Sequence, residues 1–262
     1  MDLGLSGAVA AVAAASRGLG LACARALAAE GARVAICSRD AERIRAAAAS
    51  LAASTGQAAL PVVADVATAD GYERFAAAVR EAYGRCDILV LNSGGPPPGT
   101  FDSLSVDDFR AASELLLLSA VRGTKAFLPL LSASERGRII VITSTSVREV
   151  LPNLMLSNSL RAAVTNWAKT LARELAPRGI TVNCVAPGTI DTERIAELIA
   201  ANARRQQTDA ETVRRQLLAR IPMGRFGRPE ELAAAVAFLA SRQASFITGI
   251  TLTVDGAQTS AP

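Results

Sequence analysis

Short apolar runs alternate with longer amphipathic segments along almost the whole chain. The apolar runs are rich in Val, Ile, Leu and Ala and span residues 9–13, 33–37, 60–63, 87–91, 138–143, 181–185 and 251–254. A crossover between two parallel strands needs a dozen or more residues, usually a helix, and most of the intervening segments meet this requirement. We therefore expect an α/β fold, a single Rossmann-type doubly wound domain in which helices cover both faces of a seven-stranded parallel sheet.

The segments between the runs predict the helices. Amphipathic spacing and end signals place them at 19–30, 41–53, 69–83, 106–131, 154–176 and 229–240. Asp40 is the expected N-cap of the second of these, and Pro229 lies at the first turn of the last. Segment 190–220 reads as a helical excursion with a polar middle, and the prolines of 96–98 exclude regular structure until about Ser105. Without a linker or repeat, residues 1–262 form one domain, with 189–220 covering the substrate.

Composition excludes several classes of function. The chain has no histidine, which rules out histidine triads, histidine general bases and metal sites that need imidazole. Four separated cysteines, Cys23, Cys37, Cys86 and Cys184, fit a reduced cytoplasmic protein better than a disulfide framework. The net charge of +4 comes from arginines scattered among acids, so we expect no nucleic-acid partner. No apolar stretch reaches the roughly 18 residues of a membrane span, so we expect no membrane partner.

A glycine loop follows the first strand. Gly18 and Gly20, together with Ser16, Arg17 and Leu19, would let the backbone approach a pyrophosphate at the N-terminus of the next helix. Two glycines in a turn are a weak signal alone, and their position between a strand and a helix gives them weight.

The second strand leads into a basic residue. Arg39 stands where an acid would favour NAD(H), and a basic residue there suits the 2′-phosphate of NADP(H). Arg39 and Arg17 therefore favour NADP(H) over NAD(H), with a surface arginine as the alternative for Arg39. Asp65, followed by Val66, either binds the adenine amino group or caps the next helix.

Five sequence blocks resemble the short-chain dehydrogenase/reductase family, in particular its 3-oxoacyl-[acyl-carrier-protein] reductases. They are DILVLNSGG (87–95), RIIVITST (138–145), the block 161–192 that ends in PGTIDT, IPMGRFGRPEELAAAVAFLAS (221–241) and FITGITLTVDGA (246–257). The resemblance covers nearly the whole chain. It implies a dinucleotide-binding oxidoreductase that acts on a small-molecule substrate and assembles as a homotetramer, and it adds cofactor contacts at Asn92, Gly94, Pro187, Gly188, Ile190 and Thr192.

The same resemblance shows which catalytic residues are missing. The family tetrad is Asn, Ser, Tyr and Lys, and its positions correspond here to Leu116, Ser144, Ser157 and Arg161. Only Ser144 is kept, and Ala14 replaces the first glycine of the nucleotide motif. With the loop NSGGPPPG (92–99), the chain resembles a divergent subgroup of the family in which both the nucleotide motif and the tetrad are incomplete.

Three functions remain open from the sequence. The first is a reductase in which Ser144, Ser157 and Arg161 form an atypical catalytic site. The second is a redox-inactive nucleotide-binding pseudoenzyme or scaffold, and the third is an enzyme of altered chemistry that uses other polar residues, Arg148, Glu149, Asn153 and Asn158.

Several of these residues also have a purely structural interpretation. Ser157 is also a small pocket-lining residue, Arg161 also a helix-surface arginine, Thr192 also a helix N-cap and Leu116 also plain core. We expect no metal ligands.

Overall fold

Seven parallel strands form the single sheet of this structure, a computed structural model that describes residues 2–261. Their order across the sheet is β3-β2-β1-β4-β5-β6-β7. The strands are β1 (Val9–Val12), β2 (Arg33–Ser38), β3 (Leu60–Val63), β4 (Ile88–Leu91), β5 (Arg138–Ile142), β6 (Thr181–Pro187) and β7 (Thr251–Val254). The central strands are buried on both faces, which explains why they read as continuous apolar runs in the sequence. The predicted doubly wound fold is confirmed.

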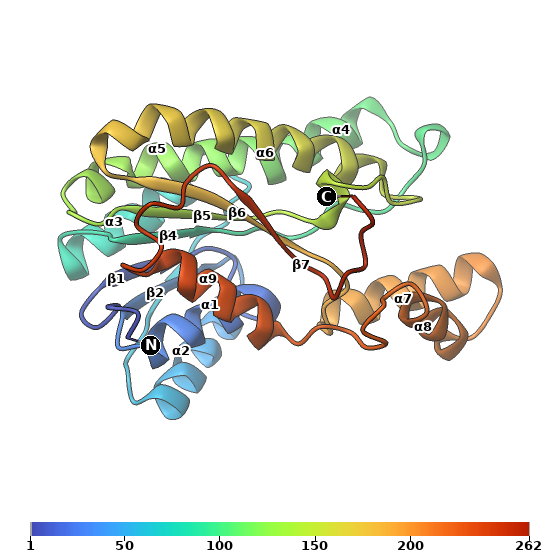
Figure 1. The fold of residues 1–262 in the computed structure, drawn as a ribbon, viewed down its shortest axis with the longest axis horizontal. Coiled ribbons are helices and arrows are strands. Elements are labelled where there is room, and N and C mark those ends of the chain that lie inside the picture. Colours follow the sequence, from blue (N-terminus) through green and yellow to red (C-terminus); the bar gives the residue numbers. More distant parts are fainter. Residues whose placement is uncertain (1, 262) are drawn as a thin grey trace.

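Helices cover both faces of the sheet (Figure 1). One face carries α3 (Gly71–Tyr83), α4 (Val106–Ser113), α5 (Ser119–Ser132) and α6 (Met155–Leu175). The other face carries α1 (Gly18–Ala29), α2 (Ala41–Thr55) and α9 (Pro229–Ala240). Two further helices, α7 (Glu193–Gln206) and α8 (Ala210–Leu218), lie at one end of the sheet, beyond the carboxyl end of β6.

Two elements differ from the sequence prediction. The helix predicted at 106–131 contains a π-helical segment, Glu114–Leu118, between α4 and α5. The excursion predicted at 190–220 consists of two helices, because the backbone of Gln207 takes a left-handed conformation (φ 52°) and Asp209 caps α8 by accepting from the amide of Thr212 at 2.7 Å. Asp40 caps α2 as predicted, accepting from the amides of Glu42 and Arg43.

The prolines after β4 also permit more structure than expected. A short 3₁₀ turn, Phe101–Ser103, forms where the sequence predicts none before Ser105. Among residues 2–261, one helical stretch, Val106–Ser132, is long and apolar enough to span a membrane, and half of its most apolar window is buried within the domain.

A buried carboxylate joins three strands near their amino ends. Asp87, just before β4, accepts the amide of Val9 at 2.7 Å through Oδ2 and the hydroxyl of Ser134 at 2.5 Å through Oδ1. Two arginines pair with the same carboxylate, Arg85 at 3.2 Å from Oδ2 and Arg136 at 4.0 Å from Oδ1, and the Asp87 side chain is only 2 % exposed. These bonds fix the starts of β1 and β4 relative to the turn that leads into β5.

The strand order reverses direction between β1 and β4. Strands β2 and β3 follow on one side of β1, whereas β4 to β7 follow on the other. In open sheets of this kind ligands bind outside the carboxyl ends of the strands at such a reversal. The loops after β1, β4, β5 and β6 are therefore the places to look for a site.

Candidate functional site

The loop after β1 approaches its neighbours closely. A Cβ atom on Gly20 would lie 2.5 Å from the carbonyl oxygen of Ala14, so no larger residue fits there. The side-chain amide of Asn92, a residue that directly follows β4, donates through Nδ2 to the carbonyls of Ala13 (3.4 Å) and Ala14 (3.2 Å). The first turn of α1 has no side-chain cap, because Arg17 occupies the N-cap position without capping it. Its amide groups are therefore available to an anion such as a pyrophosphate.

Ala14 holds a conformation that suits glycine. Its φ is 48°, in the left-handed region, as is that of Gly18 at 55°. A left-handed backbone costs a non-glycine residue about 1–2 kcal/mol. A glycine at this position, as the resemblance predicts, would adopt the same backbone conformation without that cost.

The two arginines expected at the 2′-phosphate lie in different surroundings. Arg39 directly follows β2 and is exposed, and its side chain makes no ion pair with any residue of 2–261. Arg17 instead turns toward α7, where its guanidinium bonds to the carboxylate of Glu193 and lies 3.6 Å from Glu197. The hydrogen bond to Glu193 is the main reason why the pKa of Arg17 is raised.

Asp65 does not cap a helix. Its Oδ1 accepts the amide of Ala67 at 3.0 Å within the turn after β3, whereas the N-cap position of α3 is taken by Asp70. The capping alternative for Asp65 is therefore wrong. Val66, beside it, is buried at 6 % exposure.

Three serines meet where β5 ends. Ser144 caps the short 3₁₀ helix Thr145–Val147 by accepting the amide of Ser146 at 3.1 Å. The hydroxyl of Ser157, from α6, lies 3.4 Å from that of Ser146, and both side chains are buried. The structure thus brings Ser157 to Ser146 rather than to Ser144. Sequence reasoning did not select Ser146, although the Thr-Ser-Thr-Ser run after β5 offers a second hydroxyl two residues beyond Ser144.

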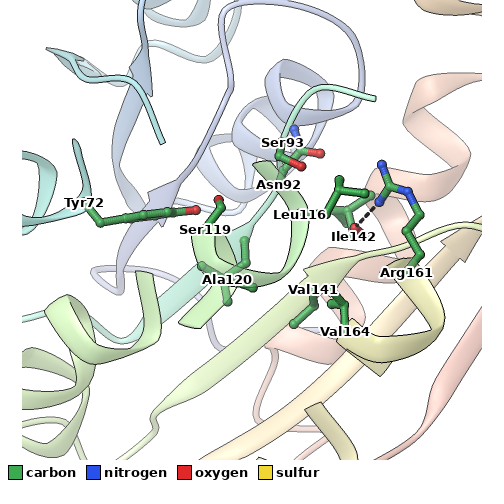
Figure 2. A pocket seen from close by; sticks show the side chains of 11 residues that line it. Tyr72, Asn92, Ser93, Leu116, Ser119, Ala120, Val141, Ile142, Arg161 and Val164 are labelled. Atoms are coloured by element: carbon green, nitrogen blue, oxygen red, sulfur yellow. Dashed lines mark hydrogen bonds between the residues drawn. The ribbon is translucent and has the colours of Figure 1, made fainter. Parts of the chain in front are cut away.

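Arg161 closes a small cavity between α6, β4 and β5 (Figure 2). Its guanidinium donates to the carbonyl of Ile142 at 3.1 Å, and the cavity of about 20 Å³ has room for about one water molecule. Burial, helped by the nearby positive charge of Arg194, lowers the pKa of Arg161 to about 10. The group therefore stays cationic at neutral pH, so it can hold an anionic or hydroxyl-bearing ligand but cannot act as a base there.

Leu116 lies in the wall of the same cavity. It belongs to the π-helical segment and is 4 % exposed, so its methyl groups form a buried apolar surface at the position that the resemblance aligns with the family asparagine. Tyr72, from α3, also borders the cavity, with its ring fully buried and its hydroxyl toward Ser119 (Figure 2). Burial raises the pKa of Tyr72, which makes its hydroxyl a weaker acid than a free tyrosine.

The loop after β6 leads into α7. Gly188 packs against Asp255, since a Cβ there would lie 2.5 Å from that side chain, and Ile190 is buried. Thr192 occupies the N-cap position of α7 without a side-chain cap bond and borders Gly18, whose Cβ would lie 3.9 Å from its methyl group. Gly94, in the loop after β4, has open space where its Cβ would be.

The first turn of α7 contacts the loops after β1 and β4. Arg194, in its first turn, donates to the carbonyl of Pro96 at 2.9 Å, in the proline loop after β4. Glu193 of the same turn bonds to Arg17 in the glycine loop. These two contacts place α7 across the carboxyl ends of β1 and β4, where Figure 1 shows it beyond the sheet.

The other polar residues considered from the sequence serve local structure. Asn158 bonds twice to the backbone of Leu151, at 3.3 and 2.9 Å, and so holds the loop before α6. Arg148 donates to the carbonyl of Thr251 at 3.4 Å, and Glu149 accepts the amide of Ser260. Asn153 has a left-handed backbone with φ 61°. None of these hydrogen bonds joins the four residues to Ser144, Ser146 or Ser157.

Comparison with known proteins agrees with this geometry. Residues 13–259 match the family model described as enoyl-(acyl carrier protein) reductase. The chain is 36% identical over 256 residues to the 3-oxoacyl-[acyl-carrier-protein] reductase FabG of Escherichia coli (strain K12), covering 97% of this chain and 98% of the relative. L-sorbose reductase of Gluconobacter frateurii, solved with NADPH and L-sorbose, matches with a TM-score of 0.95 and 33% identity over 100% of both chains.

A third relative has an unusual site of its own. The NADPH-bound structure of a short-chain oxidoreductase from Pseudomonas aeruginosa PAO1, which contains an atypical catalytic center, has a TM-score of 0.86 and 31% identity. The match covers 97% of this chain and 98% of that one. The sequence blocks, the strand order and these matches show that the chain belongs to the short-chain dehydrogenase/reductase family.

Proposed function

We propose that the protein is an NADP(H)-dependent reductase of a small-molecule carbonyl compound, similar to 3-oxoacyl-[acyl-carrier-protein] reductases but with an atypical active site. The observation that carries the proposal is the set of loops at the carboxyl ends of the strands, where an uncapped α1 N-terminus follows a tight glycine loop and the buried hydroxyls of Ser146 and Ser157 lie together after β5. The NADPH of two related structures supports the choice of cofactor.

The cofactor contacts follow from the loops at the carboxyl ends of the strands. We assign them to Ser16, Arg17, Gly18, Leu19, Gly20, Arg39, Asp65, Val66, Asn92, Gly94, Arg161, Pro187, Gly188, Ile190 and Thr192. When bound, the nicotinamide supplies the hydride. Arg161 holds the ribose and keeps a positive charge beside it, while segment 189–220 covers the substrate and excludes water.

The catalytic assignment is Ser144, Ser157 and Arg161, with Ser146 added from the structure. A serine hydroxyl donates a hydrogen bond to a carbonyl oxygen and so orients and polarises it. Its pKa is far too high for general acid catalysis near neutrality, so the proton comes from water or from the substrate. The site can therefore position the carbonyl group for hydride transfer, but it offers no serine that can supply the proton near neutral pH.

A redox-inactive nucleotide-binding protein is the alternative. It is favoured by one observation, the absence from the serine cluster of any described side chain that exchanges a proton near neutral pH. Such a protein binds NADPH without oxidising it in the presence of any carbonyl compound. Binding and turnover measured on the same sample therefore separate the two functions.

Replacing Arg39 or Arg17 with alanine tests the cofactor assignment. Each charge-assisted contact to a 2′-phosphate contributes roughly 1.5–3 kcal/mol, so each variant is expected to bind NADPH about 10- to 150-fold more weakly while NADH binding changes little. Fluorescence titration with both cofactors gives the values. Arg110→Ala, which removes an exposed arginine of α4, is the control. Equal affinity of the wild type for NADPH and NADH would contradict the assignment.

We further propose a homotetramer in the cytoplasm. Strand β7 is an edge strand, and the fully exposed Phe246 and the 40 % exposed Ile250 leave an apolar surface beside it. On the helical face Val106 is 68 % and Leu118 37 % exposed, so single apolar side chains also reach the surface there. Light scattering at micromolar concentration is expected to give four times the monomer mass, and a monomer would contradict the proposed assembly.

The four unpaired buried thiols support the cytoplasm, a reducing compartment, as the location of the protein.

A further inference from the structure

An acidic side chain of α7 pairs with the arginine that the proposed function assigns to the cofactor. Arg17 lies in the glycine loop, where the proposed function assigns it to the 2′-phosphate of NADP(H). In the structure its guanidinium bonds to Glu193 of α7, and Glu197, one turn further, lies 3.6 Å away. Glu193 lies in the first turn of α7, and Glu197 also lies 3.6 Å from Arg194 of the same helix.

The pair is of a kind that exchanges partners easily. The side chain of Arg17 is 46 % exposed and that of Glu193 is 66 % exposed, so both groups remain partly hydrated. Exposed ion pairs of this sort contribute little to stability. A phosphate carries more charge than a carboxylate and offers three acceptor oxygens, so it competes well for the same guanidinium.

We propose that Glu193, assisted by Glu197, sets the preference between NADP(H) and NAD(H) by competing with the 2′-phosphate for Arg17. The proposal rests on the proposed function, in which Arg17 contacts this phosphate. NADP(H) must displace the carboxylate, whereas NAD(H) has no 2′-phosphate and leaves the ion pair intact. Glu193 therefore weakens the binding of one cofactor only. It acts through Arg17 and is a specificity-determining residue that need not touch the cofactor itself.

The test compares Glu193→Gln with the wild type by fluorescence titration with NADPH and NADH. Removing the competing charge is expected to tighten NADPH binding about two- to five-fold, the range that an exposed ion pair allows, with NADH affinity nearly unchanged. Adding Glu197→Gln increases the effect. The matched control is Glu211→Gln, which removes an exposed carboxylate from the first turn of α8, where it forms no ion pair with residues 2–261.

Two further measurements isolate the contact. Calorimetry with adenosine 2′,5′-bisphosphate and with 5′-AMP separates the 2′-phosphate from the rest of the cofactor, and only the bisphosphate should gain affinity in Glu193→Gln. In an Arg17→Ala background, Glu193→Gln should leave the NADPH-to-NADH ratio unchanged. Thermal unfolding of every variant shows that the fold is retained.

Three outcomes count against the inference. If wild-type protein prefers NADPH and Glu193→Gln leaves the ratio unaltered, or weakens NADPH, then Glu193 does not compete and the proposed function stands alone. If Glu193→Gln still raises the ratio in the Arg17→Ala background, the effect does not pass through Arg17. If the wild-type protein binds neither cofactor, the proposed function and the inference both fail.

Discussion

Reduction of simple ketones and 3-oxoacyl thioesters by NADPH is expected to run about 10² to 10⁴ times slower than in a family member that has the tyrosine, since this is the usual cost of losing a positioned acid. The hydroxyl of Ser157 reaches the serine cluster but has no pKa near neutrality. Arg161, with a pKa lowered to about 10, remains protonated and does not lower the pKa of a serine enough. NADPH oxidation over a panel of carbonyl compounds measures the rates.

The pH dependence and a double variant make this prediction sharper. With Arg161 charged throughout, the rate between pH 6 and 9 should be nearly flat, because deprotonation of Arg161 begins to matter only as the pH approaches 10. Ser157→Tyr combined with Arg161→Lys should raise the rate and introduce an ionisation in this range, because a nearby cation lowers the pKa of tyrosine. Fast turnover by the wild type that disappears in Ser157→Ala would contradict our interpretation, since serine would then carry the proton path.

The second large effect concerns stability. Asp87→Ala is expected to lower the free energy of unfolding by about 3–5 kcal/mol, as removal of one partner from a buried charged network usually does. The change would leave the amide of Val9 and the hydroxyl of Ser134 without their acceptor. It would also remove the ion pairs that Arg85 and Arg136 make with Asp87. Urea unfolding followed by circular dichroism gives the value.

Asp107→Ala is the matched control for this variant. Asp107 pairs with Arg110 at 2.7 Å on α4, but both side chains are largely exposed, Asp107 at 83 % and Arg110 at 75 %. The expected loss is therefore less than about 1 kcal/mol. Similar losses for Asp87→Ala and Asp107→Ala would show that the buried network does not hold the strands as we infer.

The architecture was predictable because buried strands give continuous apolar runs in the sequence. A parallel strand that is covered on both faces is expected to be apolar throughout, so a run such as residues 88–91 identifies it directly. The turns are equally local, and the cap formed by Asp40 depends only on the residues that follow it. The glycine loop and the family resemblance then pointed to the loops at the carboxyl ends of the strands, which the parallel sheet brings to the same edge.

The side-chain contacts among the loops at the carboxyl ends of the strands were not predictable in the same way. The pairing of Arg17 with Glu193 joins residues 176 positions apart, and the charge of neither identifies the other. The choice of Ser146 over Ser144 as neighbour of Ser157 depends on the 3₁₀ turn after β5. Asp65 shows the same limit, since a carboxylate before a helix suggested a cap, whereas Asp70 lies nearer the first turn of α3.

The four cysteines also have a consequence for how the protein can be observed. All four are buried, and burial raises the pKa of each thiol to about 12, so the nucleophilic thiolate is scarce in the folded state. Reaction with a thiol reagent must then wait until the chain opens around the cysteine. Cys23 lies in α1, Cys37 in β2, Cys86 just before β4 and Cys184 in β6. The native chain therefore carries its own labels, whose rates of modification report the opening of one helix and of three different strands.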